Sequence, residues 1–274
     1  MSSFGERNDR ARPRGKPGRG GPRHAFHGQK NASAPEGMEW VWGRHAALAA
    51  LANPARTPVG RILATAEVAK LIGKPPPGVR IETLTNGEIA QALPPGAVHQ
   101  GLAAAVAPLE PVAIEDLAED AHGVLLMLDQ LTDPQNVGAV LRSAAAFGAR
   151  GVIMQDRHAP PFSGALAKAA AGALEQVPIA RVTNLSRALE TLADAGWRAL
   201  GLAGDAEATL AETLDGQPTV LVLGSEGEGL RRLVSEHCDL LVRIPMPGGF
   251  ESLNVAAAGA IALYEASRKL AARV

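Results

Sequence analysis

The residues best suited to chemistry lie in the last quarter of the chain, where two hydrophobic segments each run into a glycine-rich turn. One segment is VLVLGSEGEGL, residues 220–230, and the other is IPMPGGFESLN, residues 244–254. Glycine gives such turns backbone freedom, and Ser252 would cap a helix that begins near Leu253. Ligands of open α/β sheets bind where strands end and helices begin, so the turns predict a binding site. The alternative is a purely structural connection.

The first turn lacks the patterns of phosphate-binding loops. It has no Lys followed by Ser or Thr, and Gly224, Gly227 and Gly229 do not have the G-x-G-x-x-G spacing. Glu226 and Glu228 would repel a pyrophosphate at short range. The turn therefore favours a neutral or cationic ligand, and the sulfonium of S-adenosylmethionine (AdoMet) meets this requirement.

The second turn is flanked by apolar residues. Ile244, Met246 and Leu253 could form walls around an adenine ring.

A third polar segment, LDQLTDPQNVGAVLR, spans residues 128–142 and contains Asn136 and Arg142. Six residues turn a helix by about 600°, so the two side chains share a face only if Asn136 precedes the helix. An Asn cap and a solvated Arg remain the alternative.

Short apolar runs alternate with amphipathic stretches from residue 123 onward. This alternation indicates an α/β fold with a mainly parallel sheet that is covered on both faces. The predicted strands are residues 124–129, 151–154, 177–180, 198–202, 219–223 and 240–244. The predicted helices are residues 136–147, 164–174, 185–195 and 230–237.

Residues 37–108 indicate a smaller α/β domain, followed by an acidic, proline-bearing linker over residues 109–122. The smaller domain is predicted to contain helices at 39–52 and 86–93 and strands at 61–64, 79–83 and 101–107.

The N-terminal tail, residues 1–36, contains eight Lys and Arg residues against three acidic ones, and it is rich in Gly and Pro. Such a composition predicts a disordered tail that binds nucleic acid backbones, with a purely solubilising role as the alternative.

Composition excludes several other classes of protein. The single Cys238 excludes an internal disulfide and favours a reducing cytoplasm. No apolar run approaches the roughly 20 residues of a membrane helix, and no signal peptide is evident, so we expect a cytoplasmic protein without membrane contact.

The three polar segments together resemble the SpoU (TrmH-like) family of RNA ribose 2′-O-methyltransferases. The matching motifs occur in order: Asn136 with Arg142, then residues 224–227 (GSEG), then residues 244–246 (IPM) with residues 252–254 (SLN). The resemblance runs from about Gly37 to the end of the chain. It implies a SPOUT-type trefoil knot within a methyltransferase domain at 123–274, an L30e-like RNA-binding domain at 37–108, and a homodimer.

The resemblance also implies the residues of the site. The catalytic residues would be Asn136, Arg142, Glu226, Ser252 and Asn254. The cofactor, AdoMet, would be bound by Leu223, Gly224, Ile244, Met246, Ser252 and Leu253, and no metal is expected. The Phe250-Glu251 pair before Ser252 departs from the small, hydroxyl-bearing residues usual in the family.

The implied reaction is methyl transfer from AdoMet to a ribose 2′-hydroxyl, as in members that methylate a guanosine of 23S rRNA. We expect Arg142 to contact the 2′-oxygen, Asn136 to orient Arg142, and Glu226 with Asn254 to fix the ribose. The alternatives are the same chemistry on tRNA and a non-catalytic rRNA-binding assembly factor. Cys238 lies outside every motif, which argues against methylation of a base carbon.

Overall fold

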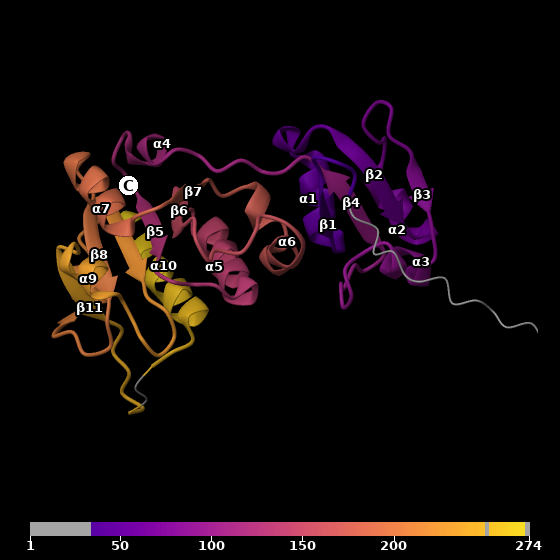
Figure 1. Cartoon of the computed structure of the whole chain (residues 1–274). Helices are drawn as coiled ribbons and strands as arrows, with labels where there is room; N and C mark the ends of the chain where they lie inside the picture. The colour runs from indigo at the N-terminus through magenta and orange to yellow at the C-terminus, as the bar shows by residue number, and fades with distance from the viewer. Residues whose placement is uncertain (1–33, 250–251, 272–274) are drawn as a thin grey trace, which may run out of the picture. The chain divides into compact units, whose positions relative to one another are not determined.

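The computed structural model describes residues 34–249 and 252–271. Most of the predicted disordered tail, residues 1–36, lies outside this range, and so do Phe250 and Glu251. Within the described residues the strands form two separate sheets, one of four strands and one of seven (Figure 1).

The four-stranded sheet lies in the N-terminal part of the chain and has the order β1-β4-β2-β3. Strand β4 pairs antiparallel with β1 and β2, and β3 pairs parallel with β2. Its elements in chain order are β1 (Glu39–Trp42), α1 (Arg44–Ala52), η1 (Pro54–Arg56), β2 (Val59–Ala64), α2 (Ala66–Ile72), β3 (Ile81–Thr83), α3 (Asn86–Gln91) and β4 (Leu102–Val106).

The helix predicted over residues 39–52 is wrong in its first part. Residues Glu39–Trp42 form strand β1, in which Trp40 and Val41 are buried against the sheet. Aromatic and β-branched side chains favour a pleated surface, and Gly43, at φ 94°, separates the strand from α1. Helix α2 was not predicted.

The seven-stranded sheet is parallel throughout and has the order β7-β6-β5-β10-β8-β11-β9, which confirms the predicted mainly parallel sheet. Its two central strands, β5 (Val124–Leu128) and β10 (Thr219–Leu223), are buried at every position. The other strands are β6 (Gly151–Gln155), β7 (Ile179–Val182), β8 (Arg198–Leu202), β9 (Ala208–Thr209) and β11 (Leu240–Arg243).

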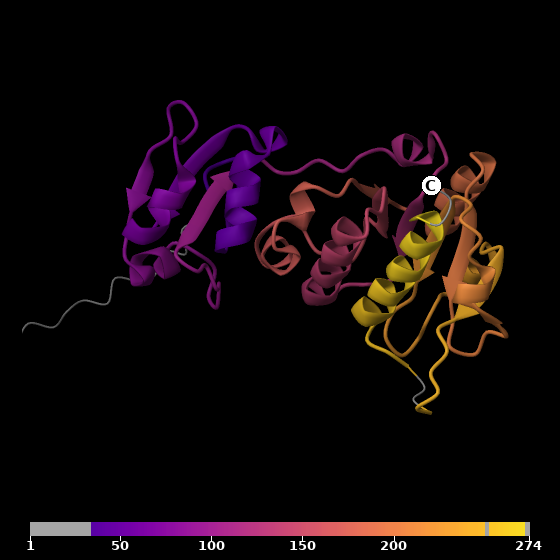
Figure 2. The same ribbon diagram turned by 180° about the vertical axis from the view of Figure 1, so that it is seen from behind.

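Helices cover both faces of this sheet. Successive residues of a strand point to opposite faces, and every residue of β5 and β10 is buried, so both faces must be covered. Leu126 and Leu221 face one core with α5 (Pro134–Ala146) and α10 (Val255–Ala271), which lie side by side in Figure 2. Neighbouring residues of the same strands face a second core with helices α7 (Leu185–Asp194) and α9 (Arg232–Glu236), which are labelled in Figure 1. The remaining helices of this part are α4 (Ile114–Ala118), α6 (Gly164–Ala170), η2 (Ala173–Glu175) and α8 (Leu210–Thr213).

The predicted linker, residues 109–122, is partly structured. It contains helix α4, whose Leu117 and Ala118 are buried in the core beside α7. Its apolar residues therefore pack on the sheet instead of connecting two bodies loosely.

Candidate functional site

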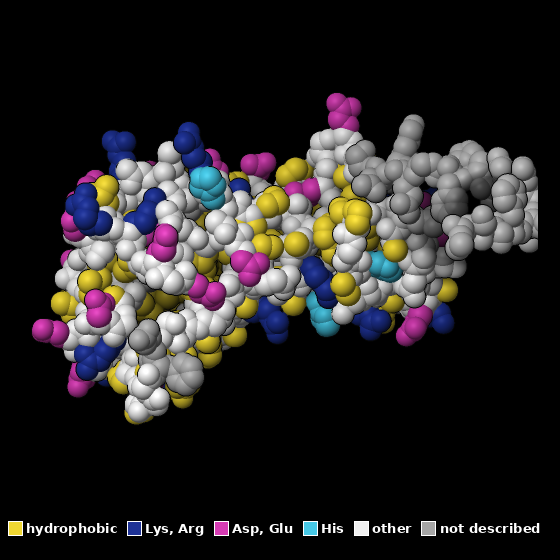
Figure 3. Space-filling view, turned by 60° about the horizontal axis from the view of Figure 1, so that its bottom comes forward, with side chains coloured by type: hydrophobic (Ala, Val, Ile, Leu, Met, Phe, Trp, Pro, Cys, Tyr) yellow, Lys and Arg dark blue, Asp and Glu magenta, His cyan; other side chains and the backbone are white. Residues whose placement is uncertain are grey.

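A cavity of about 680 Å³ opens at the carboxyl ends of the neighbouring strands β10, β8 and β11. In an open parallel sheet this edge is where ligands bind. Figure 3 shows the face at this edge, on which hydrophobic side chains lie in a hollow with acidic side chains near its rim.

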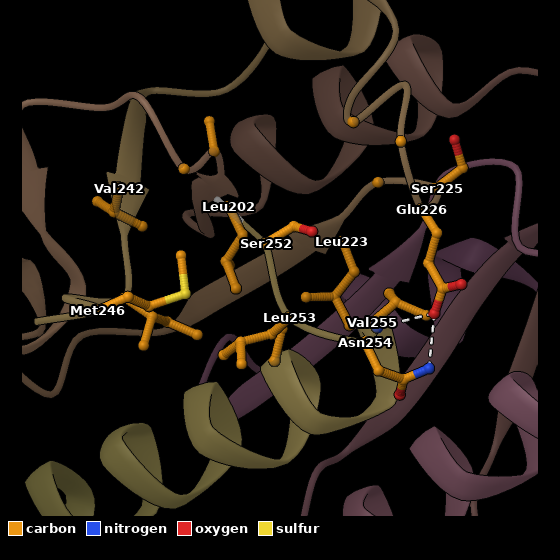
Figure 4. A pocket seen from close by; sticks show the side chains of 17 residues that line it. Leu202, Leu223, Ser225, Glu226, Val242, Met246, Ser252, Leu253, Asn254 and Val255 are labelled. Carbon is orange, nitrogen blue, oxygen red and sulfur yellow. Dashed lines mark hydrogen bonds between the residues drawn. The ribbon is translucent and has the colours of Figure 1, made fainter. Parts of the chain in front are cut away.

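The walls of the cavity are largely apolar (Figure 4). All six predicted cofactor residues line it: Leu223, Gly224, Ile244, Met246, Ser252 and Leu253. Sequence reasoning missed the wall that β8 contributes, residues 202–204. No local signal marks them, because only the pairing of β8 between β10 and β11 brings them to the site.

The glycine loop, residues 224–230, folds back on itself at one side of the cavity. The backbones of Ser225 and Gly229 exchange two hydrogen bonds of 3.1 Å. A Cβ atom at Gly224 would lie 2.2 Å from the carbonyl carbon of Gly229, so only glycine permits this close approach. The loop therefore presents backbone and Glu226 to the cavity.

Three polar side chains from distant parts of the chain meet beside this loop. Glu226 Oε1 accepts hydrogen bonds from Asn254 Nδ2 at 2.6 Å and from Asn136 Nδ2 at 3.4 Å. Asn254 Nδ2 also donates to Asn136 Oδ1 at 3.0 Å. The structure thus brings three of the five predicted catalytic residues into one cluster, the polar triad of Asn136, Glu226 and Asn254.

The start of α10 is held by this cluster and not by Ser252. Asn254 Oδ1 accepts from the backbone N–H groups of Ala256 and Ala257 at 3.0 and 3.3 Å, which is the pattern of an N-cap. Val255 N–H donates to Glu226 Oε1 at 3.3 Å, as Figure 4 shows. The prediction that Ser252 caps the helix was therefore wrong. Ser252 is exposed and lines the cavity.

Asn136 lies inside α5, because Asp133 supplies the N-cap and Pro134 is the first helical residue. Its side chain is consequently on a different face from Arg142, six residues further along. Arg142 is exposed and does not line the cavity, and within the described residues it forms no hydrogen bond with Asn136. The expectation that Asn136 orients Arg142 was therefore wrong within one chain.

Cys238 is not equipped to act as a nucleophile. Burial, reinforced by the negative charges of Asp239 and Asp129, raises the pKa of its thiol to about 12. A thiol with such a pKa is almost entirely protonated at neutral pH.

Residues 34–249 and 252–271 contain no group of three or more His, Cys, Asp or Glu side chains that could hold a metal ion. None of their helices is both long and apolar enough to span a bilayer.

Known proteins share this sequence and architecture. The model of the SpoU rRNA Methylase family matches residues 123–264. An uncharacterised tRNA/rRNA methyltransferase of Synechocystis sp. is 39% identical over 248 residues, which cover 86% of this chain and 64% of that protein. This chain thus spans less than two thirds of the length of that relative.

Two more comparisons concern proteins with a stated activity or ligand. The 23S rRNA (guanosine-2′-O-)-methyltransferase RlmB of Pseudomonas aeruginosa is 45% identical over 177 residues, 63% of this chain and 71% of that protein. The structure of the SpoU methyltransferase AviRb from Streptomyces viridochromogenes in complex with AdoMet superposes with a TM-score of 0.70 at 25% identity. That superposition covers 85% of this chain and 90% of the other.

Proposed function

The chain belongs to the SpoU rRNA methylase family, and from this premise we propose that it transfers a methyl group from AdoMet to a ribose 2′-hydroxyl of RNA. The observation that carries the proposal is the position of the polar triad at the edge of the cavity. The similarity to RlmB favours a guanosine of 23S rRNA as the target.

The cavity has the size and chemistry that AdoMet requires. A volume of about 680 Å³ lies within the usual range for ligands of this size, roughly 300–1,000 Å³. Leu223, Met246 and Leu253 offer apolar contact to an adenine, and the glycine loop offers backbone groups. Glu226 supplies a carboxylate near a cationic sulfonium.

Bound AdoMet supplies a methyl group that its sulfonium already activates. The task of the chain is to hold the ribose 2′-oxygen in line with that methyl, and such orientation contributes about 7–11 kcal/mol at most. We assign Glu226 and Asn254 to fixing the ribose. The guanidinium of Arg142, placed at the 2′-oxygen, stabilises the negative charge that develops there while the hydroxyl proton passes to solvent water.

Arg142 reaches this position most directly from a second subunit. It is exposed on α5, away from the triad of its own chain. Beside α5, helix α10 exposes 39% of Ile261 and 50% of Tyr264, and Tyr264 packs edge-on against Phe147 at 5.9 Å. We infer that this apolar face joins two copies in a homodimer, with Arg142 of one subunit serving the cavity of the other.

Three finer features belong to the same proposal. Residues 220–254 would form the trefoil knot, which is supported by the contact of Asn254 with the glycine loop. Residues 37–108 would form the L30e-like RNA-binding domain, and residues 123–274 the methyltransferase domain. A cytoplasmic location would give the enzyme access to RNA.

The proposal is tested by supplying purified protein with radiolabelled AdoMet and transcripts of 23S rRNA, 16S rRNA and tRNA. We expect label only in 23S rRNA, at the 2′-oxygen of a guanosine after nucleoside digestion. Label in tRNA instead would support the same chemistry on another target. RNA binding without label in any transcript would contradict the proposal and support an assembly factor.

A further inference from the structure

The glycine loop begins and ends beside one buried carboxylate. Asp129, the residue that follows β5, is 0% exposed. Its backbone N–H donates to the carbonyl of Leu223 at 2.8 Å, where the loop begins. Its carboxylate accepts two hydrogen bonds from Arg231, where the loop ends: one from the backbone N–H at 2.9 Å and one from Nε at 2.7 Å. One residue therefore holds both ends of the loop.

The same residue also begins the turn that leads to α5. Gln130 follows it with a left-handed backbone, φ 60°, and the turn ends at Asp133, which caps the helix that carries Asn136. The two loops meet again where Asn136 Nδ2 donates to Glu226 Oε1 at 3.4 Å. They are thus joined at the base by Asp129 and at the tip by the polar triad.

We propose that Asp129 is a positioning residue for the reaction, and that its pairing with Arg231 fixes the glycine loop, which bears Glu226 and lines the cofactor cavity. This inference rests on the proposed methyltransferase function. Buried carboxylates form strong hydrogen bonds with charged donors, and removing the acceptor leaves those donors unsatisfied. We call the pairing of Asp129 with Arg231 the clamp. Without it, residue 231 at the end of the loop would lose both of its hydrogen bonds to Asp129, while the contacts at the tip would remain.

A second Arg–Asp pair, formed by Arg198 of β8 and the partly exposed Asp215, provides a control for the chemical change. Arg198 Nη1 lies 3.3 Å from Asp215 Oδ2 at the amino ends of the strands, opposite to the cavity. Asp215→Asn makes the same chemical change as Asp129→Asn, but it touches no loop of the site.

The experiment measures AdoMet affinity by titration calorimetry, 23S rRNA affinity by filter binding, and the melting temperature of each variant. We expect Asp129→Asn to weaken AdoMet binding about ten- to a hundredfold, because the two donors of Arg231 reach different oxygens of Asp129, and Asn replaces one of these oxygens with an NH2 group that cannot accept. Arg231→Ala should weaken it less, since the backbone N–H of residue 231 still reaches Asp129. In both variants RNA affinity should stay within about twofold of the wild type, and Asp215→Asn should leave both affinities within the same range.

The outcomes separate this inference from the proposed function. A wild-type protein that does not bind AdoMet would refute the proposed function. A wild-type protein that binds AdoMet, with a folded Asp129→Asn variant of equal affinity, would refute the clamp alone. If Asp129→Asn does not fold, Arg231→Ala decides the question: weakened AdoMet binding with intact RNA binding supports the clamp, and unchanged AdoMet binding overturns it. Parallel losses of AdoMet and RNA affinity would mean that the pair serves only general stability.

Discussion

Asn254 uses the oxygen and the nitrogen of its side-chain amide for different partners. Its oxygen caps α10, and its nitrogen holds Glu226 and Asn136. The same residue therefore contributes to helix stability and to the geometry of the site, and suitable substitutions should separate the two roles.

Asn254→Ser keeps a good N-cap but loses the amide nitrogen, whereas Asn254→Ala loses both. We expect the Ala variant to lose about 0.5–2 kcal/mol of unfolding free energy, and the Ser variant only a few tenths. Both should lower kcat/KM for methyl transfer by about ten- to a hundredfold, because Glu226 loses its 2.6 Å donor. Denaturant unfolding and steady-state kinetics check this, and full activity of Asn254→Ser would assign the residue to capping alone.

The thiol of Cys238 should react slowly in the native protein. With its pKa raised to about 12, its thiolate fraction at pH 8 is roughly a thousandfold below that of a free cysteine. We therefore expect very slow reaction with a disulfide reagent in the native protein and rapid reaction after unfolding in guanidinium chloride. Rapid labelling of the native protein would show that the thiol is accessible and ionised.

The elements that carry long apolar runs were predictable, whereas short or marginal ones were not. Strands β8 and β10 have the predicted bounds. The continuous Val and Leu run of β10 favours a buried strand, and β8 has apolar residues at positions 199, 200 and 202. The strand Glu39–Trp42 was misassigned, because the strand with which it pairs, β4, lies about sixty residues away.

Most of the residues that line the cavity were predictable from the sequence, but their arrangement was not. The two glycine turns and the resemblance to a known family indicated the lining of the cavity. The choice between Ser252 and Asn254 as the cap could not be made from sequence, since both residue types favour that position. The contacts of Asn136 and Asp129 with the glycine loop depend on β5 and β10 being neighbours.

His99 connects a turn before β4 to the start of α3. It is largely buried, and its Nδ1 accepts from the backbone N–H of Gly101 at 3.1 Å. Burial lowers its pKa below the ordinary value of 6.5, and a hydrogen bond with the backbone of Asn86 opposes that shift only in part. The unfolded chain therefore takes up a proton at higher pH than the folded chain does, so stability falls as pH drops through about 6.5.

His99→Asn should flatten this pH dependence, since Asn keeps an acceptor near Gly101 but does not titrate. Between about pH 7.5 and 5.5, the range in which a histidine titrates, the melting temperature of the wild type should fall more steeply than that of the variant. Identical slopes in thermal scans would contradict the prediction.

In the proposed dimer of the whole molecule, each site contains residues of both chains, because Arg142 of one subunit serves the cavity of the other. Ile261→Glu with Tyr264→Lys should yield monomers in size-exclusion chromatography with light scattering, because both charges would be buried at the interface. Leu233→Glu, at an exposed position of α9 on the other side of the sheet, is the control and should leave the dimer intact. Dimers that survive the double substitution would place the interface elsewhere.

Subunit mixing tests the sharing of Arg142. Arg142→Ala homodimers should be nearly inactive, and Asn254→Ala homodimers should show the ten- to hundredfold lower kcat/KM expected above, about 1–10% of the wild type. Refolded together, they should regain activity, because a mixed dimer contains one site with an intact triad and Arg142 of the partner subunit. No recovery in a mixture shown to contain mixed dimers would mean that each chain uses its own Arg142.

Titration calorimetry of the purified protein with AdoMet shows whether the cavity between the two glycine turns binds this cofactor. We predict saturable binding of one AdoMet per chain by the wild type. Binding should persist in Gly87→Ala, where an added Cβ meets nothing within 4 Å, and be lost or strongly weakened in Gly224→Ala, where it meets Gly229 at 2.2 Å. A wild-type protein that binds neither AdoMet nor its demethylated product would contradict the account.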